Sequence, residues 1–149
     1  SDIDFVLTFE EVVGMFQAKG VQFGELPADK TQSEAASADG RGFAVSGGVA
    51  SAVVNCIREM DPEREIKVAN AEGLRECRQL LTDAGKGKYD GYLLEGMACP
   101  GGCVGGAGTM QGPTKSKGQI TVAMKKSRKK NALESTYKDR LDLLAERED

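Results

Sequence analysis

Apolar residues recur at helical spacing in three stretches of the chain. One stretch begins with the capping box of Thr8 and Glu11 and ends at Gly20. A second lies between Gly48 and Asp61-Pro62, and its apolar stripe consists of Val49, Ala52, Val53, Cys56, Ile57 and Met60. A third precedes Gly85, with Asn70 as its expected N-cap, and its inner face carries Leu74, Cys77, Leu80, Leu81 and Ala84. These patterns predict three helices.

Short apolar runs between the predicted helices have the length and residue types of β-strands. They cover residues 3–8, 66–69 and 89–94. Strands that alternate with helices are typical of a parallel sheet, because parallel neighbours are joined by crossovers. We therefore predict an α/β fold, in which a parallel-type sheet is flanked by helices. In such folds ligands bind beyond the carboxyl ends of the strands.

Two further regions differ in composition from the predicted helices and strands. Residues 24–42 are rich in Pro, Ser, Ala, Asp and Gly and are expected to form a long irregular surface loop. Beyond residue 113 a basic cluster is followed by an apolar series, Leu133, Tyr137, Leu141 and Leu144, that predicts a helix over an acidic tail. The basic cluster is Lys125, Lys126, Arg128, Lys129 and Lys130, and we favour a solvated helix face over a docking patch. We expect a domain over residues 1–113 and a C-terminal helical extension over residues 114–149.

Composition and charge exclude several functions. The chain has 149 residues, no histidine, and a net charge of -3, so neither imidazole-based catalysis nor a global basic field for nucleic acid is available. No apolar run is long enough to cross a membrane, and the N-terminus has no signal-peptide pattern, so we expect a cytoplasmic protein without nucleic-acid or membrane partners. Because the chain begins at Ser1 within a predicted strand, we expect a piece of a longer polypeptide.

The four cysteines fall into two groups. Cys56 and Cys77 lie on apolar helical stripes, where a free cysteine acts as a small core residue. Cys99 and Cys103 lie in the glycine-rich segment EGMACPGGCVGGAG, which follows the last predicted strand. If Cys99 caps a helical turn that begins at Pro100, both thiols face one side at its positive end, which suits an iron-sulfur cluster. The alternative is a Pro-Gly turn whose thiols are free or joined in a local disulfide.

The same segment resembles a signature of the iron-only hydrogenases. It matches their third signature, Glu-x-Met-x-Cys-x-x-Gly-Cys-x-x-Gly-Gly-Gly, at Glu95, Met97, Cys99, Gly102, Cys103, Gly106 and Gly108. The stretches DIDFVLT, FAVSGGVASAVVN and KYDGYLLEGMACPGGC are similar, in the same order, to the second lobe of that family's catalytic domain. The resemblance covers residues 1 to about 110 and implies one lobe of a two-lobed hydrogenase catalytic domain.

The resemblance implies the family's cofactor, the H-cluster, in which a four-iron cubane is joined to a di-iron unit by a cysteine sulfur. It implies that Cys99 ligates the cubane, that Cys103 ligates it and bridges to the di-iron unit, and that Met97 packs beside that unit. Gly102 and Gly106 are expected to let the backbone approach the cofactor. A cubane needs four thiolates, so the other two are expected from a first lobe, and the chain alone is expected to be inactive.

The implied activity is reversible proton reduction and hydrogen oxidation. Its implied partners are the first lobe of the same polypeptide, a ferredoxin-like electron donor, and protons or hydrogen. Ala107, Thr109 and Met110 depart from the family's pattern and indicate a divergent branch. A non-catalytic hydrogen sensor or an iron-sulfur assembly protein is therefore the alternative. A thiol-disulfide or generic metal module that uses only Cys99 and Cys103 is a third hypothesis.

Overall fold

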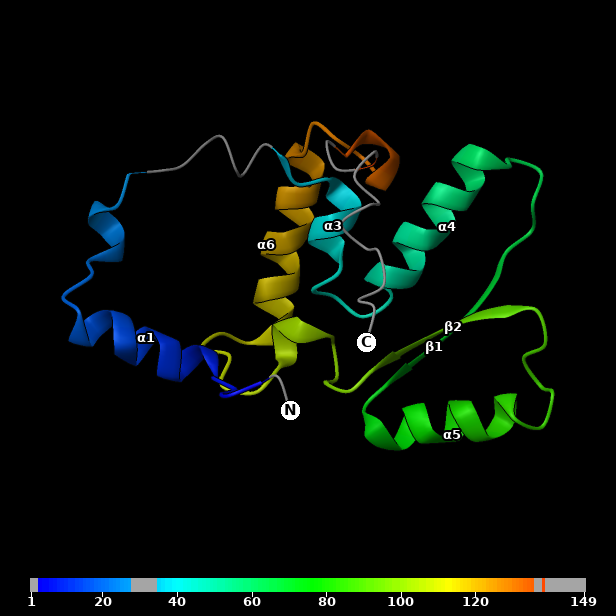
Figure 1. The fold of residues 1–149 in the computed structure, drawn as a ribbon, viewed down its shortest axis with the longest axis horizontal. Coiled ribbons are helices and arrows are strands. Elements are labelled where there is room, and N and C mark those ends of the chain that lie inside the picture. The colour runs from blue at the N-terminus through cyan, green and yellow to red at the C-terminus, as the bar shows by residue number, and fades with distance from the viewer. Residues whose placement is uncertain (1–2, 28–34, 136–137, 139–149) are drawn as a thin grey trace, which may run out of the picture.

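A computed structural model describes residues 3–27, 35–135 and 138 of the chain. Figure 1 shows one pair of strands toward one end of the molecule, with helices on either side of it and further helices beyond them. In chain order the elements are α1 (Phe9–Ala18), η1 (Phe23–Glu25), α3 (Ala38–Gly42), α4 (Gly48–Met60), β1 (Lys67–Glu72), α5 (Leu74–Ala84), β2 (Tyr92–Met97), η2 (Cys103–Gly105), α6 (Pro113–Lys126) and η3 (Ala132–Glu134).

The two strands form a parallel sheet. β1 pairs with β2 in a register that runs from Lys67 opposite Tyr92 to Glu72 opposite Met97. Helix α5 connects the strands and packs against both, and α4 packs against β2. In Figure 1 α4 lies on one side of the strands and α5 on the other. The predicted α/β class with a parallel sheet is therefore confirmed.

The three predicted helices form, but they bury fewer apolar side chains than their patterns predict. The capping box of α1 is present, since Thr8 Oγ1 accepts from the Glu11 amide and the Glu11 carboxylate accepts from the Thr8 amide. Helix α4 buries Ala50, Ala52 and Val54, which only partly overlap the predicted stripe. On α5 only Leu80 is buried.

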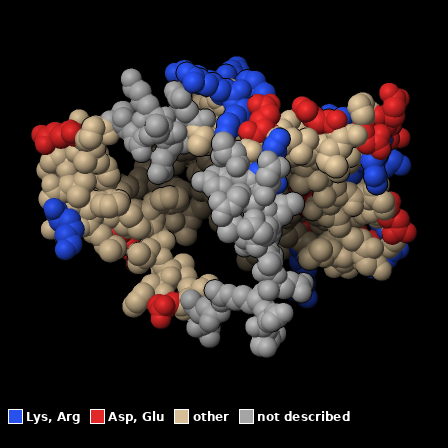
Figure 2. All heavy atoms as spheres, turned by 45° about the horizontal axis from the view of Figure 1, so that its top comes forward, with Lys and Arg blue, Asp and Glu red and all other residues tan. Residues whose placement is uncertain are grey.

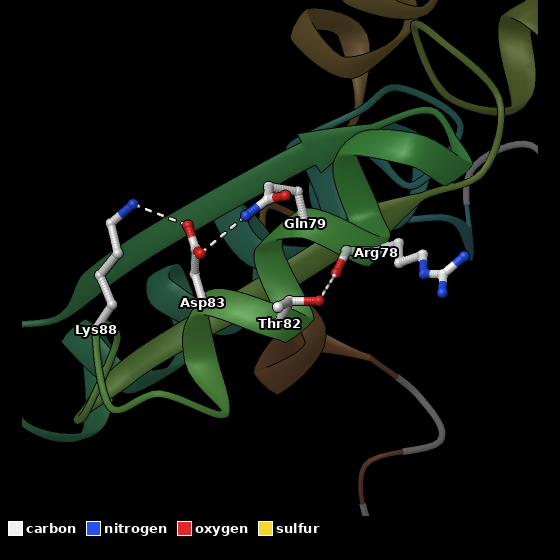
Figure 3. A network of polar contacts seen from close by, with 5 residues as sticks. All are labelled: Arg78, Gln79, Thr82, Asp83 and Lys88. Atoms are coloured by element: carbon white, nitrogen blue, oxygen red, sulfur yellow. Dashed lines mark hydrogen bonds and ion pairs between the residues drawn. The ribbon is translucent and has the colours of Figure 1, made fainter.

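Polar side chains at the carboxyl end of α5 and in the following turn form a small network (Figure 3). Lys88 Nζ lies 2.9 Å from Asp83 Oδ2, and Gln79 Nε2 donates to the other oxygen of that carboxylate at 2.9 Å. The hydrogen bond from Lys88 is the main cause that lowers the pKa of Asp83 below its ordinary value. This network stabilises the turn that leads from α5 toward β2.

The first predicted strand, over residues 3–8, is wrong. These residues form neither helix nor strand, and Phe5 and Val6 are 85% and 88% exposed. A strand needs a neighbouring strand to pair its backbone groups, and the sheet of the described residues consists of β1 and β2 alone. Most apolar side chains of residues 3–8 therefore remain exposed.

Several predicted boundaries are also wrong. Asn70 does not cap a helix, because β1 continues to Glu72 and Gly73, with a φ of 84°, takes the N-cap position. The last strand begins and ends three residues later than predicted, at Tyr92–Met97. Residues 24–42 include α3, which Ser37 caps, and residues 28–34 lie outside the described part.

The C-terminal elements pack against the middle of the chain. Helix α6 lies along α3, where a Cβ on Gly42 would be 3.1 Å from Met124 Cε. Arg41 Nε donates to Ser127 Oγ at 3.0 Å. Leu133 belongs to the short η3, and Tyr137, Leu141 and Leu144 of the predicted last helix lie outside the described residues.

Candidate functional site

The signature cysteines lie on the loop that follows β2, which we call the cysteine loop (residues 98–106). It begins where both strands present their carboxyl ends, which is the position that the sequence predicts for a ligand. Of the two conformations considered for this loop, a helical turn capped by Cys99 and a Pro-Gly turn, the structure has the second, since the Gly102 amide donates to the Cys99 carbonyl at 2.9 Å. Gly101 and Gly102 have φ values of 85° and 92°, so the chain turns away from a helix, and η2 begins only at Cys103.

The cysteine loop packs backbone to backbone against residues 44–46. The Ser46 amide donates to the Gly101 carbonyl at 3.1 Å, and the Val104 amide donates to the Ala44 carbonyl at 3.0 Å. A Cβ on Gly102 would lie 2.6 Å from Ser46 N and 2.8 Å from Ala44 O. No side chain fits at position 102, so glycine there allows the backbone of the loop to contact residues 44–46.

The other glycines of the segment also meet parts of the same chain. A Cβ on Gly106 would lie 3.1 Å from the Cys103 carbonyl oxygen. A Cβ on Gly105 would meet the Pro100 carbonyl, and a Cβ on Gly108 would meet the Thr8 side chain. Close internal packing therefore explains much of the glycine content of this segment.

Glu95 connects β2 to the amino end of α4. Its side chain is buried, and Oε1 accepts hydrogen bonds from the Val49 amide at 3.0 Å and the Ala50 amide at 3.2 Å. The N-cap residue of α4 is Gly47, which has no side chain to accept these bonds. Glu95 therefore caps the helix from a distant strand. Its Oε2 is buried without a partner in the described part of the chain.

Glu72 is a second carboxylate at the strand ends, and the sequence analysis missed it. Its Oε2 accepts a hydrogen bond from the Gly101 amide at 2.8 Å. This bond is the main cause that lowers the pKa of Glu72, and a hydrogen bond with the Ser46 side chain and the charge of Lys117 lower it further. No local motif marks Glu72, because its proximity to the loop follows from the strand register, which places it opposite Met97.

The four thiols differ in exposure, and no disulfide joins them. Cys103 is exposed, whereas Cys99, Cys56 and Cys77 are half-buried. The predicted burial of Cys56 and Cys77 is thus only partial. Cys77 Sγ lies 3.6 Å from the carbonyl oxygens of both Ala71 and Met97, so it packs between the strands and α5.

Cys103 lies on the wall of an apolar cavity of about 670 Å³. Side chains of α1 and α6 line the cavity together with Val104, which is buried, and Met110, which is exposed. Met97 is half-buried at the end of β2. Exposed Cys103 and half-buried Cys99 thus lie on one loop beyond the carboxyl ends of the strands. Cys103 borders the apolar cavity.

Thiolates are the donors that iron-sulfur clusters use. Within the described residues no group of three or more His, Cys, Asp or Glu side chains is placed to hold a metal ion. Cys99 and Cys103 carry the donor type that a cubane requires, and they could supply two of its four thiolates.

Lys and Arg side chains gather at the end of the molecule where α6 ends (Figure 2). Lys125 and Lys126 are exposed in the last turn of α6, where cations interact favourably with the helix dipole. Lys130 Nζ donates to the Ser127 carbonyl at 3.1 Å. Local interactions at the carboxyl end of α6 thus explain the positions of Lys125, Lys126 and Lys130.

Comparison with known proteins gives a family match over most of the chain. The model of the family described as "Iron only hydrogenase large subunit, C-terminal domain" matches residues 1–107. The periplasmic [Fe] hydrogenase large subunit of Nitratidesulfovibrio vulgaris is 31% identical over 72% of this chain and 32% of its own length. The NADP-reducing hydrogenase subunit HndD of Solidesulfovibrio fructosivorans is 28% identical over 72% of this chain and 23% of its own length.

A third relative has a different description. The nuclear prelamin A recognition factor of Xenopus laevis is 38% identical over 36% of this chain and 12% of its own length. The chain thus spans about a third or less of each of these relatives. No helix among the described residues is long and apolar enough to cross a membrane. The cytoplasmic location stays a prediction, since one relative is described as periplasmic.

Proposed function

This chain belongs to the family of the iron-only hydrogenase large subunit, C-terminal domain, and on that premise we propose that its cysteine loop supplies two thiolate ligands of an H-cluster. The ligands are Cys99 and Cys103. The observation that carries the proposal is the position of both cysteines on one loop beyond the carboxyl ends of the parallel strands, with the Cys103 thiol exposed.

When bound, the H-cluster supplies the reversible reduction of protons to hydrogen. The residues of this chain bind and orient it. Cys99 and Cys103 would hold iron through their sulfurs, and Met97, at the end of β2, would offer an apolar side chain to the bound group. Gly102 and Gly106 shape the loop that carries both thiolates, through the close backbone contacts of Gly102 with residues 44–46 and of Gly106 with Cys103.

The remaining thiolates come from a first lobe of the same polypeptide. Two observations support such a partner. The described residues offer only two thiolates on the loop, and residues 3–8 expose apolar side chains, among them Ile3, Phe5 and Val6 at 70%, 85% and 88%. A second lobe packed against that segment would remove this apolar surface from water. The parent protein would receive its electrons from a ferredoxin-like donor.

We place the boundary of the lobe at residue 113. The family match ends at residue 107, and α6 begins at Pro113. Residues 114–149 then form an extension, and its described part packs on the lobe through contacts between α6 and α3. The chain alone, with half of the thiolates that a cubane needs, would be inactive.

The test is the iron content of the full-length protein after substitution of single cysteines. Cys103→Ser and Cys99→Ser should each lower the iron content and abolish hydrogen evolution, because serine is a poor ligand for iron-sulfur clusters. Cys56→Ser is the matched control, since Cys56 lies on α4, away from the cysteine loop. Full iron content and hydrogen evolution in Cys103→Ser would overturn the proposal.

The second candidate is a hydrogen sensor or an iron-sulfur assembly protein that binds a cluster without turnover. It is favoured by Ala107, which stands where the hydrogenase signature has glycine. The same preparation separates the two functions. A full-length protein that binds iron through Cys99 and Cys103 but evolves no hydrogen supports this candidate.

A further inference from the structure

Glu72 holds the part of the cysteine loop that lies between the two candidate ligands. Its Oε2 accepts from the amide of Gly101 at 2.8 Å, and Gly101 is two residues from Cys99 and two from Cys103. We propose that Glu72 is a positioning residue that fixes this loop so that the two thiols are presented together. The inference rests on the proposed function, since it concerns how the chain prepares those ligands.

Both backbone polar groups of Gly101 are bound by segments that are distant in the sequence. Its amide donates to Glu72, 29 residues earlier, and its carbonyl accepts from the Ser46 amide at 3.1 Å. Gly101 has a φ of 85° and lies in a turn that the Gly102 amide closes on the Cys99 carbonyl at 2.9 Å. The two distant contacts therefore attach this turn to the end of β1 and to residue 46.

The register of the sheet makes the contact from Glu72 possible. Glu72 and Met97 are the last paired residues of the two strands, and the Gly73 amide donates to the Met97 carbonyl at 2.8 Å. Neighbouring strands lie about 4.8 Å apart. A glutamate at the end of β1 can therefore reach a loop that begins just after β2.

The carboxylate is held in its charged form. The Gly101 amide is the main cause that lowers the pKa of Glu72, and the Ser46 side chain and Lys117 act in the same direction. Hydrogen bonds to an ionised acceptor are stronger than those between neutral groups. Glu72 contacts neither thiol, so its effect on the ligands acts through the backbone of the loop.

The alternative is that the exposed Glu72 carboxylate accepts from the Gly101 amide and contributes only to the stability of the fold. Two substitutions separate it from positioning. Glu72→Gln keeps an oxygen acceptor at the same reach. Glu72→Asp keeps the charge but is one methylene shorter, so its carboxylate falls short of the Gly101 amide. Glu65→Ala is the matched control, because Glu65 is an exposed glutamate just before β1.

The first measurement needs no bound iron. Site-resolved alkylation with N-ethylmaleimide, read by mass spectrometry in the full-length protein, compares half-buried Cys99 with exposed Cys103. Loss of one anchoring hydrogen bond should raise the Cys99 rate about three- to ten-fold in Glu72→Ala and in Glu72→Asp. Glu72→Gln should stay within about two-fold of the wild type. Thermal unfolding of each variant shows whether it is folded.

The second measurement is the electron paramagnetic resonance spectrum of the same proteins after iron loading. Glu72→Asp should broaden or shift the cluster signal, whereas Glu72→Gln should give the wild-type spectrum. A change in overall stability alone would not produce this difference between the two variants. If Glu72→Ala does not fold, the other two variants decide the question. Glu72→Asp should then show the faster Cys99 alkylation and the changed spectrum, and Glu72→Gln should resemble the wild type.

Alkylation rates and spectra that are equal in Glu72→Asp, Glu72→Gln and Glu65→Ala would overturn the inference. Its failure is distinguishable from failure of the proposed function. If the cysteine variants lose iron while the Glu72 variants match the control, only the positioning role is wrong. If the cysteine variants keep iron, the proposed function is wrong, and the alkylation rates still report whether Glu72 orders the loop.

Discussion

The N-terminal segment, residues 3–27, and the cysteine loop are held by contacts of very different reach along the chain. In the N-terminal segment, Thr8 and Glu11 cap α1 across three residues, and Phe16 meets the nearby Phe23 edge to face at 5.4 Å between ring centroids. The cysteine loop is held by distant residues, since Glu72 reaches Gly101 across 29 residues.

The difference in reach accompanies a difference in burial. Apolar side chains of the N-terminal segment stay exposed, such as Phe9 at 58% and Phe23 at 55%. In the cysteine loop Gly102 and Val104 are buried against residues 44–46. Local contacts thus give the N-terminal segment a helix without a core, whereas the loop gains a fixed shape from backbone packing. Substitutions in the two regions should therefore differ in their cost.

The largest expected effect is that of Gly102→Ala. The new Cβ would lie 2.6 Å from Ser46 N in a backbone conformation with a φ of 92°. Steric overlap and an unfavourable φ should together lower the free energy of unfolding by about 3 kcal/mol. Denaturant unfolding followed by circular dichroism measures the change.

Gly118→Ala is the matched control for this substitution. Gly118 lies within α6, where nothing approaches the position of an added Cβ within 4 Å. Alanine is favoured over glycine inside a helix by about 1 kcal/mol, so this variant should be more stable than the wild type. Equal stability of the two variants would contradict the packing of residues 44–46 against the loop.

A smaller effect is expected for Glu95→Ala. The substitution removes the acceptor of the Val49 and Ala50 amides at the amino end of α4. One buried and one half-buried amide without an acceptor should lower the free energy of unfolding by about 2 kcal/mol. Glu95→Gln keeps an oxygen acceptor and should lose less. Equilibrium unfolding of the three proteins gives the order, and a Gln variant less stable than the Ala variant would refute the cap.

The smallest effect is expected in the N-terminal segment, where pH should act on the capping box of α1. The Thr8 amide is the main cause that lowers the pKa of Glu11 from its ordinary value of 4.5. A lowered pKa stabilises the folded form above the unfolded value, and this contribution disappears as the pH falls through the lowered pKa. The α1 cap should therefore be intact at neutral pH and be lost in acid.

Nuclear magnetic resonance can follow the Thr8 amide between pH 6 and pH 2. Its chemical shift should report the titration of Glu11 with a midpoint below 4.5. Glu11→Gln should remove this titration while the amides of the cysteine loop keep the wild-type shifts. A midpoint above 4.5 would mean that the capping bond does not favour the charged carboxylate.

Local signals account for what the sequence predicts correctly. The pair Thr8 and Glu11 predicts the start of α1, and the apolar stripe after Gly48 predicts α4. Asn70 was wrongly expected to cap a helix, because β1 continues to Glu72 through its pairing with β2. Residue types that favour a cap are overridden when a distant strand supplies backbone partners.

The same difference between local and distant contacts applies to the candidate site. The sequence places Cys99 and Cys103 correctly beyond a strand end, because strand and glycine signals are local. It leaves a helical turn and a Pro-Gly turn open there, and the Pro-Gly turn forms, with positive φ values at Gly101 and Gly102 that accompany contacts with residues 44–46. Glu72 has no signal at all, because its role follows from a strand register that no short motif encodes.

The bond between the Ser46 amide and the Gly101 carbonyl also orders events during biosynthesis. Closing a long stretch of chain costs more entropy than forming a helix cap, so contacts between distant residues form late. Glu95 and Val49, 46 residues apart, face the same delay. We expect the cysteine loop to take its shape only after α4 and both strands have docked. Under the proposed function, the polypeptide would then fold first and receive its metal in a loop that already has its shape.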